Sequence, residues 1–281
     1  MSKKIVFIDE LRLKENNTYH TSIMLHHDGC SFLSQLQSDK FKLAFGQVPE
    51  LSINLNQPNF QQWKNILQAD SVLDQLFKRS HKISFFLKDY RFLLVPSSFF
   101  QENEKDSLFG MGFRKLDTEA VAHQLIPAID AYILFPVNRI LQEGLQQQFN
   151  NIEIKSYFQS WFDNILSITP NGPQVFLNYS DNQLDLVYLE DKKLMQQNNF
   201  AIQSEEDLVY YTLFALEQLE LDKENRFTSI SGEFDAQSGV FNKLKSYIPN
   251  IQLLERNTLQ KAYYQINDIP KHHHHLIVPA Q

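Results

Sequence analysis

The chain has a single cysteine, Cys30, among its 281 residues. No intrachain disulfide can form, so packing and hydrogen bonds must hold the fold together. A lone cysteine flanked by apolar strand residues is usually buried, and only an activated thiolate is nucleophilic, so we expect no catalytic role for it. The opening residues, MSKKIVFIDELRLK, contain no apolar signal region, and we therefore expect a cytoplasmic protein.

Long apolar runs and blocks of basic residues are also missing. The longest apolar-looking run, residues 125–137, is interrupted by Pro127, Asp130 and Pro136, which is too broken for a membrane-spanning helix. The 26 Lys and Arg are outnumbered by 33 Asp and Glu, giving a net charge of −7 without any block of like charge. Neutralising nucleic-acid phosphates requires a concentrated basic surface, so we expect neither a membrane nor a nucleic-acid partner.

Glycine is scarce, with 8 residues in the whole chain. This is about 3% of the sequence, where an average protein has about 7%. Loops that cradle phosphate with backbone N–H groups need glycine, because a Cβ obstructs the approach of the ligand. No glycine-rich run ending in Gly-Lys-Ser or Gly-Lys-Thr occurs either, which excludes a P-loop nucleotide site.

Aromatic residues, in contrast, are abundant, with 23 Phe and 11 Tyr in a sequence that is 43% hydrophobic. This composition predicts a folded chain with a large core, and the length suits two domains or two lobes. Residues 19–48 group into three short strands with turns at 28–29 and 38–40, which predicts a three-stranded meander. Further along, the pattern predicts a helix at 59–79, two strands around a turn within 82–96, a polar loop at 102–113, a strand at 131–136, a helix at 137–149, a strand at 152–155 and a helix at 156–168.

The densest turn cluster, Thr-Pro-Asn-Gly-Pro at residues 169–173, predicts a boundary between domains 1–168 and 169–281. After it the opening pattern returns. Ser204 precedes three acidic residues, an arrangement typical of a helix N-terminus. The second half predicts strands at 174–180, 183–190 and 192–202, a helix at 204–221, a strand at 226–234, a helix at 236–248 and a strand at 251–256.

The two halves repeat a plan of three strands and a helix without repeating a sequence. Such a duplication resembles the actin-like ATPase superfamily, an α/β fold with mixed sheets whose two lobes are each ribonuclease H-like. The stretches TSIMLHHDGCSF, FLLVPSSFF, AYILFPVNRILQEGL, NYSDNQLDLVYLEDKKL and ISGEF are more closely similar to a bacterial family, domain-of-unknown-function family 3822. That resemblance implies an actin-like fold with no assigned activity.

Active members of the superfamily hold nucleotide with two hairpins of the form Asp-x-Gly and a glycine pair near the adenosine. At the corresponding positions this chain has Asn178 and Ser180 in the second hairpin, and His27 before Gly29 in the first. Gly232 is followed by Glu233, where a second glycine is expected. A carboxylate that orients Mg²⁺ is missing from both hairpins, so the resemblance implies a degenerate site.

Two functions remain open on these residues. The leading hypothesis is a non-catalytic interaction or scaffolding protein without a cofactor, with a protein partner. The alternative is a divergent ATPase or kinase that binds ATP and Mg²⁺ in the cleft between the lobes with Gly29, Ser31, Ser180, Asp181 and Gly232. A nucleic-acid processing factor is a third reading of the ribonuclease H-like plan, but the acidic charge and the lack of converging carboxylates oppose it.

Two further features have a plain and a functional interpretation. The run His272–His275 is either a solvated strand entry or a metal site, although alternate residues of a strand face opposite ways and at most two imidazoles converge. Tyr210, Tyr211 and Phe214 lie on one predicted helix, and adjacent Tyr210 and Tyr211 cannot both face inward. We expect core or boundary packing for these rings, with an interface as the alternative.

Overall fold

The computed structural model describes residues 18–26, 29–37, 39–48, 65, 71–220, 227–234 and 237–254. The described residues form two compact units, which divide between Phe162 and Asp163. This division falls inside helix α5 (Tyr157–Ile168), while the boundary predicted between residues 168 and 169 stays a prediction. The run His272–His275 and the turn residues His27 and Asp28 lie outside the described residues.

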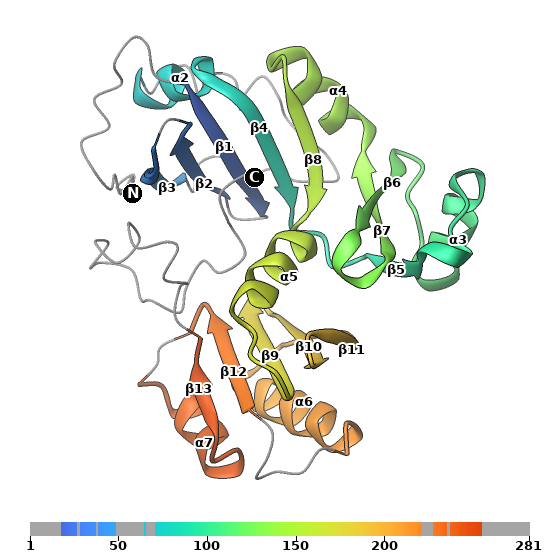
Figure 1. The fold of residues 1–281 in the computed structure, drawn as a ribbon, viewed down its shortest axis with the longest axis vertical. Helices are drawn as coiled ribbons and strands as arrows, with labels where there is room; N and C mark the ends of the chain where they lie inside the picture. Colours follow the sequence, from blue (N-terminus) through green and yellow to red (C-terminus); the bar gives the residue numbers. More distant parts are fainter. Residues whose placement is uncertain are drawn as a thin grey trace. The chain divides into compact units, whose positions relative to one another are not determined.

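The first unit is built on a five-stranded mixed sheet with the order β3-β2-β1-β4-β8 (Figure 1). Its first three strands are the predicted antiparallel meander, and β4 and β8 continue the sheet parallel to β1. A helix, α2, leads from the meander towards β4. The bounds are β1 (Tyr19–His26), β2 (Gly29–Leu36), β3 (Asp39–Val48), α2 (Ser71–Lys78), β4 (Ser80–Leu87) and β8 (Ile152–Ser156).

The second unit repeats this sheet with the order β11-β10-β9-β12-β13 and the same strand directions (Figure 1). Helix α6 stands where α2 stands in the first unit, between the meander and the fourth strand. The bounds are β9 (Pro173–Ser180), β10 (Gln183–Glu190), β11 (Lys193–Ala201), α6 (Glu205–Gln218), β12 (Phe227–Gly232), α7 (Gly239–Tyr247) and β13 (Ile251–Leu253). The predicted duplication of a mixed α/β lobe is confirmed.

Local chemistry explains why these elements begin and end where they do. The turn between β9 and β10 has positive φ at Asp181 and Asn182, 50° and 57°, as a tight two-residue hairpin requires. The next turn does the same at Asp191 and Lys192. At the start of α6 the Ser204 hydroxyl accepts a hydrogen bond from the Asp207 N–H at 3.2 Å, which is the predicted N-cap.

The first unit also contains a small antiparallel sheet with the order β5-β7-β6, which the second unit does not repeat. Here the prediction of a polar loop at 102–113 is wrong, because most of this stretch forms α3 with Phe109 fully buried. Strand β6 was not predicted. The two strands predicted around a turn within residues 82–96 are β4 and β5, and they belong to different sheets. The bounds are β5 (Leu93–Pro96), α3 (Lys105–Gly112), β6 (Glu119–Ile126), β7 (Ala131–Asn138) and α4 (Arg139–Gln148), with short 3₁₀ helices at Ser97–Phe99, Glu102–Glu104 and Pro127–Ile129.

Aromatic rings fill much of the interior of the first unit. Phe92 stacks on Phe158 at 4.6 Å between ring centroids, and Phe158 stacks on Phe162 at 5.6 Å. The core of the second unit is mostly aliphatic and lies between one face of its sheet and helices α6 and α7. Tyr210 and Phe214 depart from the expected core packing, since they are 60% and 42% exposed on α6.

Candidate functional site

The predicted nucleotide residues fall in two places that belong to different units. Gly29 and Ser31 lie in β2 of the first unit, whereas Ser180, Asp181 and Gly232 lie at one end of the sheet of the second unit. Strands β9 and β12 are parallel neighbours, so their carboxyl ends meet at the same sheet edge. The structure therefore brings the three residues of the second unit together.

A buried hydrogen-bond network occupies the end of β9 in the second unit. Asn178 stands at the position predicted for a metal-orienting carboxylate, and its amide nitrogen donates to the Ser180 hydroxyl at 3.2 Å. Its amide oxygen accepts from the Ser231 hydroxyl at 3.2 Å. All three side chains are almost completely buried. Because its amide is already engaged on both sides, Asn178 is held in place as a structural residue of the sheet.

Gly232 is explained by the neighbouring strand. A Cβ on Gly232 would lie 1.9 Å from the carbonyl oxygen of Tyr179 and 2.6 Å from its carbonyl carbon. The φ of Gly232 is 121°, which side chains of L-residues rarely adopt. The next residue, Glu233, donates its N–H to that same carbonyl at 2.7 Å. The place that a Cβ on Gly232 would take is thus filled by the backbone of Tyr179.

The charge at this sheet edge is negative. Burial raises the pKa of the half-buried Tyr179 phenol, and the carboxylates of Glu205 and Glu233 raise it further. Glu205, at the start of α6, and Glu233, directly after β12, therefore both place negative charge near the Tyr179 phenol. A phosphate group placed here would be repelled by both.

One buried carboxylate was not identified from the sequence. Asp185 of β10 lies in register with Asn178 of β9 and is fully buried. The strand QLDLVYLE carries no signal for this burial, because alternation puts Asp185 on the face opposite Leu184 and Leu186, where a polar residue is ordinarily exposed. Asp185 therefore lies directly across from Asn178 on the adjacent strand.

The predicted nucleotide residues of the first unit, Gly29 and Ser31, lie in β2 and give no sign of reactive chemistry. Gly29 pairs with His26 across the β1–β2 hairpin, and Ser31 is buried. Burial raises the pKa of the Cys30 thiol to about 12, so the thiol stays protonated at neutral pH, as predicted for an inert cysteine. Within the described ranges, no group of three or more His, Cys, Asp or Glu could hold a metal ion.

A groove of about 150 Å³ lies in the first unit where β8 passes the small sheet. Its lining is apolar apart from two amides, and consists of Ala122, Val137, Gln142, Gln146, Ile152 and Ile154. Strand β8 ends its sheet, since among the described strands only β4 pairs with it. On its other face, Glu153 forms ion pairs with Lys82 and Lys155, at 3.0 Å and 2.9 Å. The groove thus combines a strand edge with half-buried isoleucines.

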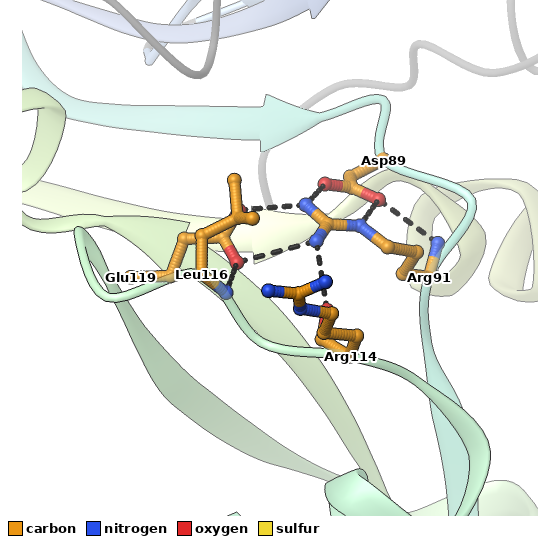
Figure 2. Close-up of polar contacts among 5 residues, drawn as sticks. All are labelled: Asp89, Arg91, Arg114, Leu116 and Glu119. Atoms are coloured by element: carbon orange, nitrogen blue, oxygen red, sulfur yellow. Dashed lines mark hydrogen bonds and ion pairs between the residues drawn. The ribbon is translucent and has the colours of Figure 1, made fainter.

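The small sheet is anchored by an ionic cluster around Arg91 (Figure 2). The guanidinium of Arg91 donates to both carboxylate oxygens of Asp89, at 3.1 Å and 2.6 Å, and to both of Glu119, at 3.2 Å and 2.7 Å. Glu119 is buried and also accepts the N–H of Leu116 at 2.8 Å. Burial alone would lower the pKa of the guanidinium, but these hydrogen bonds and charges outweigh it and hold the pKa above its ordinary value. The cluster fixes the start of β6 to the loop after β4.

A family described as protein of unknown function (DUF3822) matches residues 8–251. The chain belongs to this family. The DUF3822 chain is also similar to a protein from Bacteroides thetaiotaomicron with an actin-like ATPase fold and unknown function, with 18% identity, a TM-score of 0.76, and coverage of 92% of this chain and 100% of that one. It resembles a chain of the PilM–PilN type IV pilus biogenesis complex at 10% identity, with a TM-score of 0.57 and coverage of 86% and 89%.

These similarities confirm the predicted family and the actin-like ATPase fold. At such low identities they concern the fold alone. Comparison with the curated proteins gives no match. None of the helices in the described part of the chain has the length and apolar character needed to span a bilayer.

Proposed function

We propose that this DUF3822 protein is a non-catalytic cytoplasmic protein that binds a protein partner and does not use nucleotide. The observation that carries the proposal is the filled end of the second sheet, where Asn178 is locked between two serines and the Tyr179 backbone lies against Gly232. Phosphate binding needs open backbone N–H groups and a carboxylate to orient Mg²⁺. At this edge the backbone of Tyr179 lies against Gly232, and the carboxylates of Glu205 and Glu233 lie near the Tyr179 phenol, where they would repel a phosphate group.

The groove beside β8 supports the partner half of the proposal. A strand edge lets an extended segment add to a sheet by main-chain hydrogen bonds, while pockets for alternate side chains give specificity. Ile152 and Ile154 are spaced to receive such alternating side chains. Among the structural neighbours, one comes from a complex of two proteins, PilM and PilN. The expected partner is a protein with an extended apolar segment.

Adding ATP with Mg²⁺ should leave the melting temperature of the purified protein unchanged. A ligand at a hundredfold excess over its dissociation constant stabilises a protein by about 2.7 kcal/mol, which a thermal-shift assay resolves as several degrees. Phosphate release should also stay at the level of a no-protein blank. A clear rise in melting temperature that is lost in Asp181→Ala would instead indicate the divergent ATPase, because Asp181 belongs to the predicted nucleotide set.

Ile154→Lys should abolish partner capture, because it puts a charge on the apolar wall of the groove. The measurement compares affinity-captured proteins, identified by mass spectrometry, between the wild type and the variant. Recovery of a partner should fall by about tenfold or more, as expected when a central interface residue is lost. Ile140→Lys is the matched control, since Ile140 is 55% exposed at the start of α4 and does not line the groove. Equal loss in both variants would contradict a role of the groove.

A further inference from the structure

Strand β11 forms one end of the sheet of the second unit, and of the described strands only β10 pairs with it. Its sequence is KLMQQNNFA, so its one charge is Lys193 at the first position. Natural edge strands are usually protected from pairing by charges, prolines or short length. This strand has nine residues and an uncharged run from Leu194 to Ala201, so apart from a bulge against β10 between Leu194 and Gln196 it lacks most of that protection.

Four aromatic rings, two of them exposed, continue from this strand onto α6. Phe200 of β11 stacks on Tyr211 at 5.1 Å, Tyr211 meets Tyr210 at 5.2 Å, and Tyr210 stacks on Phe214 at 6.0 Å. We call these four residues the aromatic ladder. Tyr210 is 60% exposed and Phe214 is 42% exposed, whereas the other two rings pack against the core. Aromatic side chains exposed beside an unprotected strand edge are typical of a protein interface.

We propose that two copies of this chain associate through β11, antiparallel about a twofold axis, so that the two five-stranded sheets become one continuous sheet. Phe200 of each copy then lies opposite Leu194 of the other, and the aromatic ladders of the two copies flank the joint on the α6 side of the joined sheet. An interface of this kind uses the same surface on both copies, as a twofold dimer requires. It covers the strand edge and the exposed rings in one step.

The chemistry of β11 favours a second copy as the occupant. When the strand pairs with itself around Gln197, Lys193 of each copy lies opposite Ala201 of the other, so no like charges meet. Two chains that each carry a net charge of −7 repel one another over much of their surface, and an uncharged edge lets them approach. Glutamine and asparagine side chains can also hydrogen-bond to their own kind across the joint.

Disulfide trapping tests the strand pairing directly. Single substitutions Gln196→Cys, Gln197→Cys and Asn198→Cys are made in the full chain and oxidised with copper phenanthroline. A disulfide forms only where two Cα atoms lie about 4.4–6.8 Å apart, so cross-linking should peak at one position of β11 and fall on either side. The native Cys30 is buried with its pKa raised to about 12, and does not compete. Tyr247→Cys, exposed on α7 of the same unit, is the control and should give no cross-linked dimer.

Light scattering after size exclusion provides the second readout. The wild type should be a dimer, Tyr210→Glu and Phe214→Glu should dissociate at least about tenfold more readily, and Tyr247→Glu should behave as the wild type. A monomeric wild type overturns the proposal. This holds even if a segment of another protein is found to pair with the β11 edge. A dimer that does not cross-link through β11, or that Tyr247→Glu disrupts equally, also overturns it. Neither nucleotide binding nor the groove beside β8 bears on these outcomes.

Discussion

Gly232→Ala is expected to unfold the second unit or to destabilise it by about 3 kcal/mol or more. The new Cβ would lie 1.9 Å from the Tyr179 carbonyl oxygen, and a backbone atom inside a sheet cannot move aside. The residue would also have to hold a φ of 121°, which costs about 1–3 kcal/mol for a residue other than glycine. Urea unfolding followed by circular dichroism gives the change in the free energy of unfolding.

Two other glycines separate these causes. Gly172 has a φ of 91° and no atom within 4 Å of the place where a Cβ would lie, so Gly172→Ala reports the backbone strain alone. Gly239 has open space and begins α7, so Gly239→Ala should be close to neutral. The explanation of Gly232 by strand contact fails if Gly232→Ala costs no more than Gly172→Ala. If Gly232→Ala costs much more stability than Gly172→Ala, the contact with the Tyr179 backbone is sufficient to explain the glycine at this position without a bound nucleotide.

Arg91→Ala is expected to lower the stability of the first unit by about 3–5 kcal/mol, because it leaves the buried Glu119 carboxylate without its cation. Asp89 loses its partner too, but is more exposed. The melting temperature should fall by about 6–20 °C, at about 2–4 °C for each kcal/mol in a chain of this size. Arg91→Lys should recover only part of the loss, since an ammonium cannot reproduce the forked contacts to two carboxylates.

Two variants control for this interpretation. Arg91→Met combined with Glu119→Leu should be markedly more stable than Arg91→Ala, because the most deeply buried carboxylate is removed together with its cation and only the more exposed Asp89 is left without a partner. Lys78→Ala removes an exposed ion pair with Asp74 in α2 and should cost less than about 1 kcal/mol. An Arg91→Ala effect as small as that of Lys78→Ala would show that the cluster does not hold the small sheet in place.

The hairpins and helix starts were determined by the sequence, because each depends on residues that are close neighbours in the chain. Alternating apolar residues around Asp181 and Asn182 were enough to predict the β9–β10 hairpin, and Ser204 was enough to predict the start of α6. The repetition of these local signals in both halves was also sufficient to predict the duplicated lobe, and the resemblance to known families then implied the actin-like fold. The sequence also showed directly that residues of the nucleotide motif are missing, for example the carboxylate whose place Asn178 takes.

Only the tertiary structure decided what depends on contacts between distant residues. Glu119 meets Arg91 across 28 positions, and the stretch before it, predicted as a loop, becomes α3 because packing buries Phe109. Gly232 owes its conformation to Tyr179 on a strand more than fifty residues earlier. Tyr210 and Phe214 are exposed because α6 turns another face to the sheet, which composition cannot show. Hydrophobic pattern fixes local conformation, whereas close approach, ion pairing and exposure depend on which elements the fold places side by side.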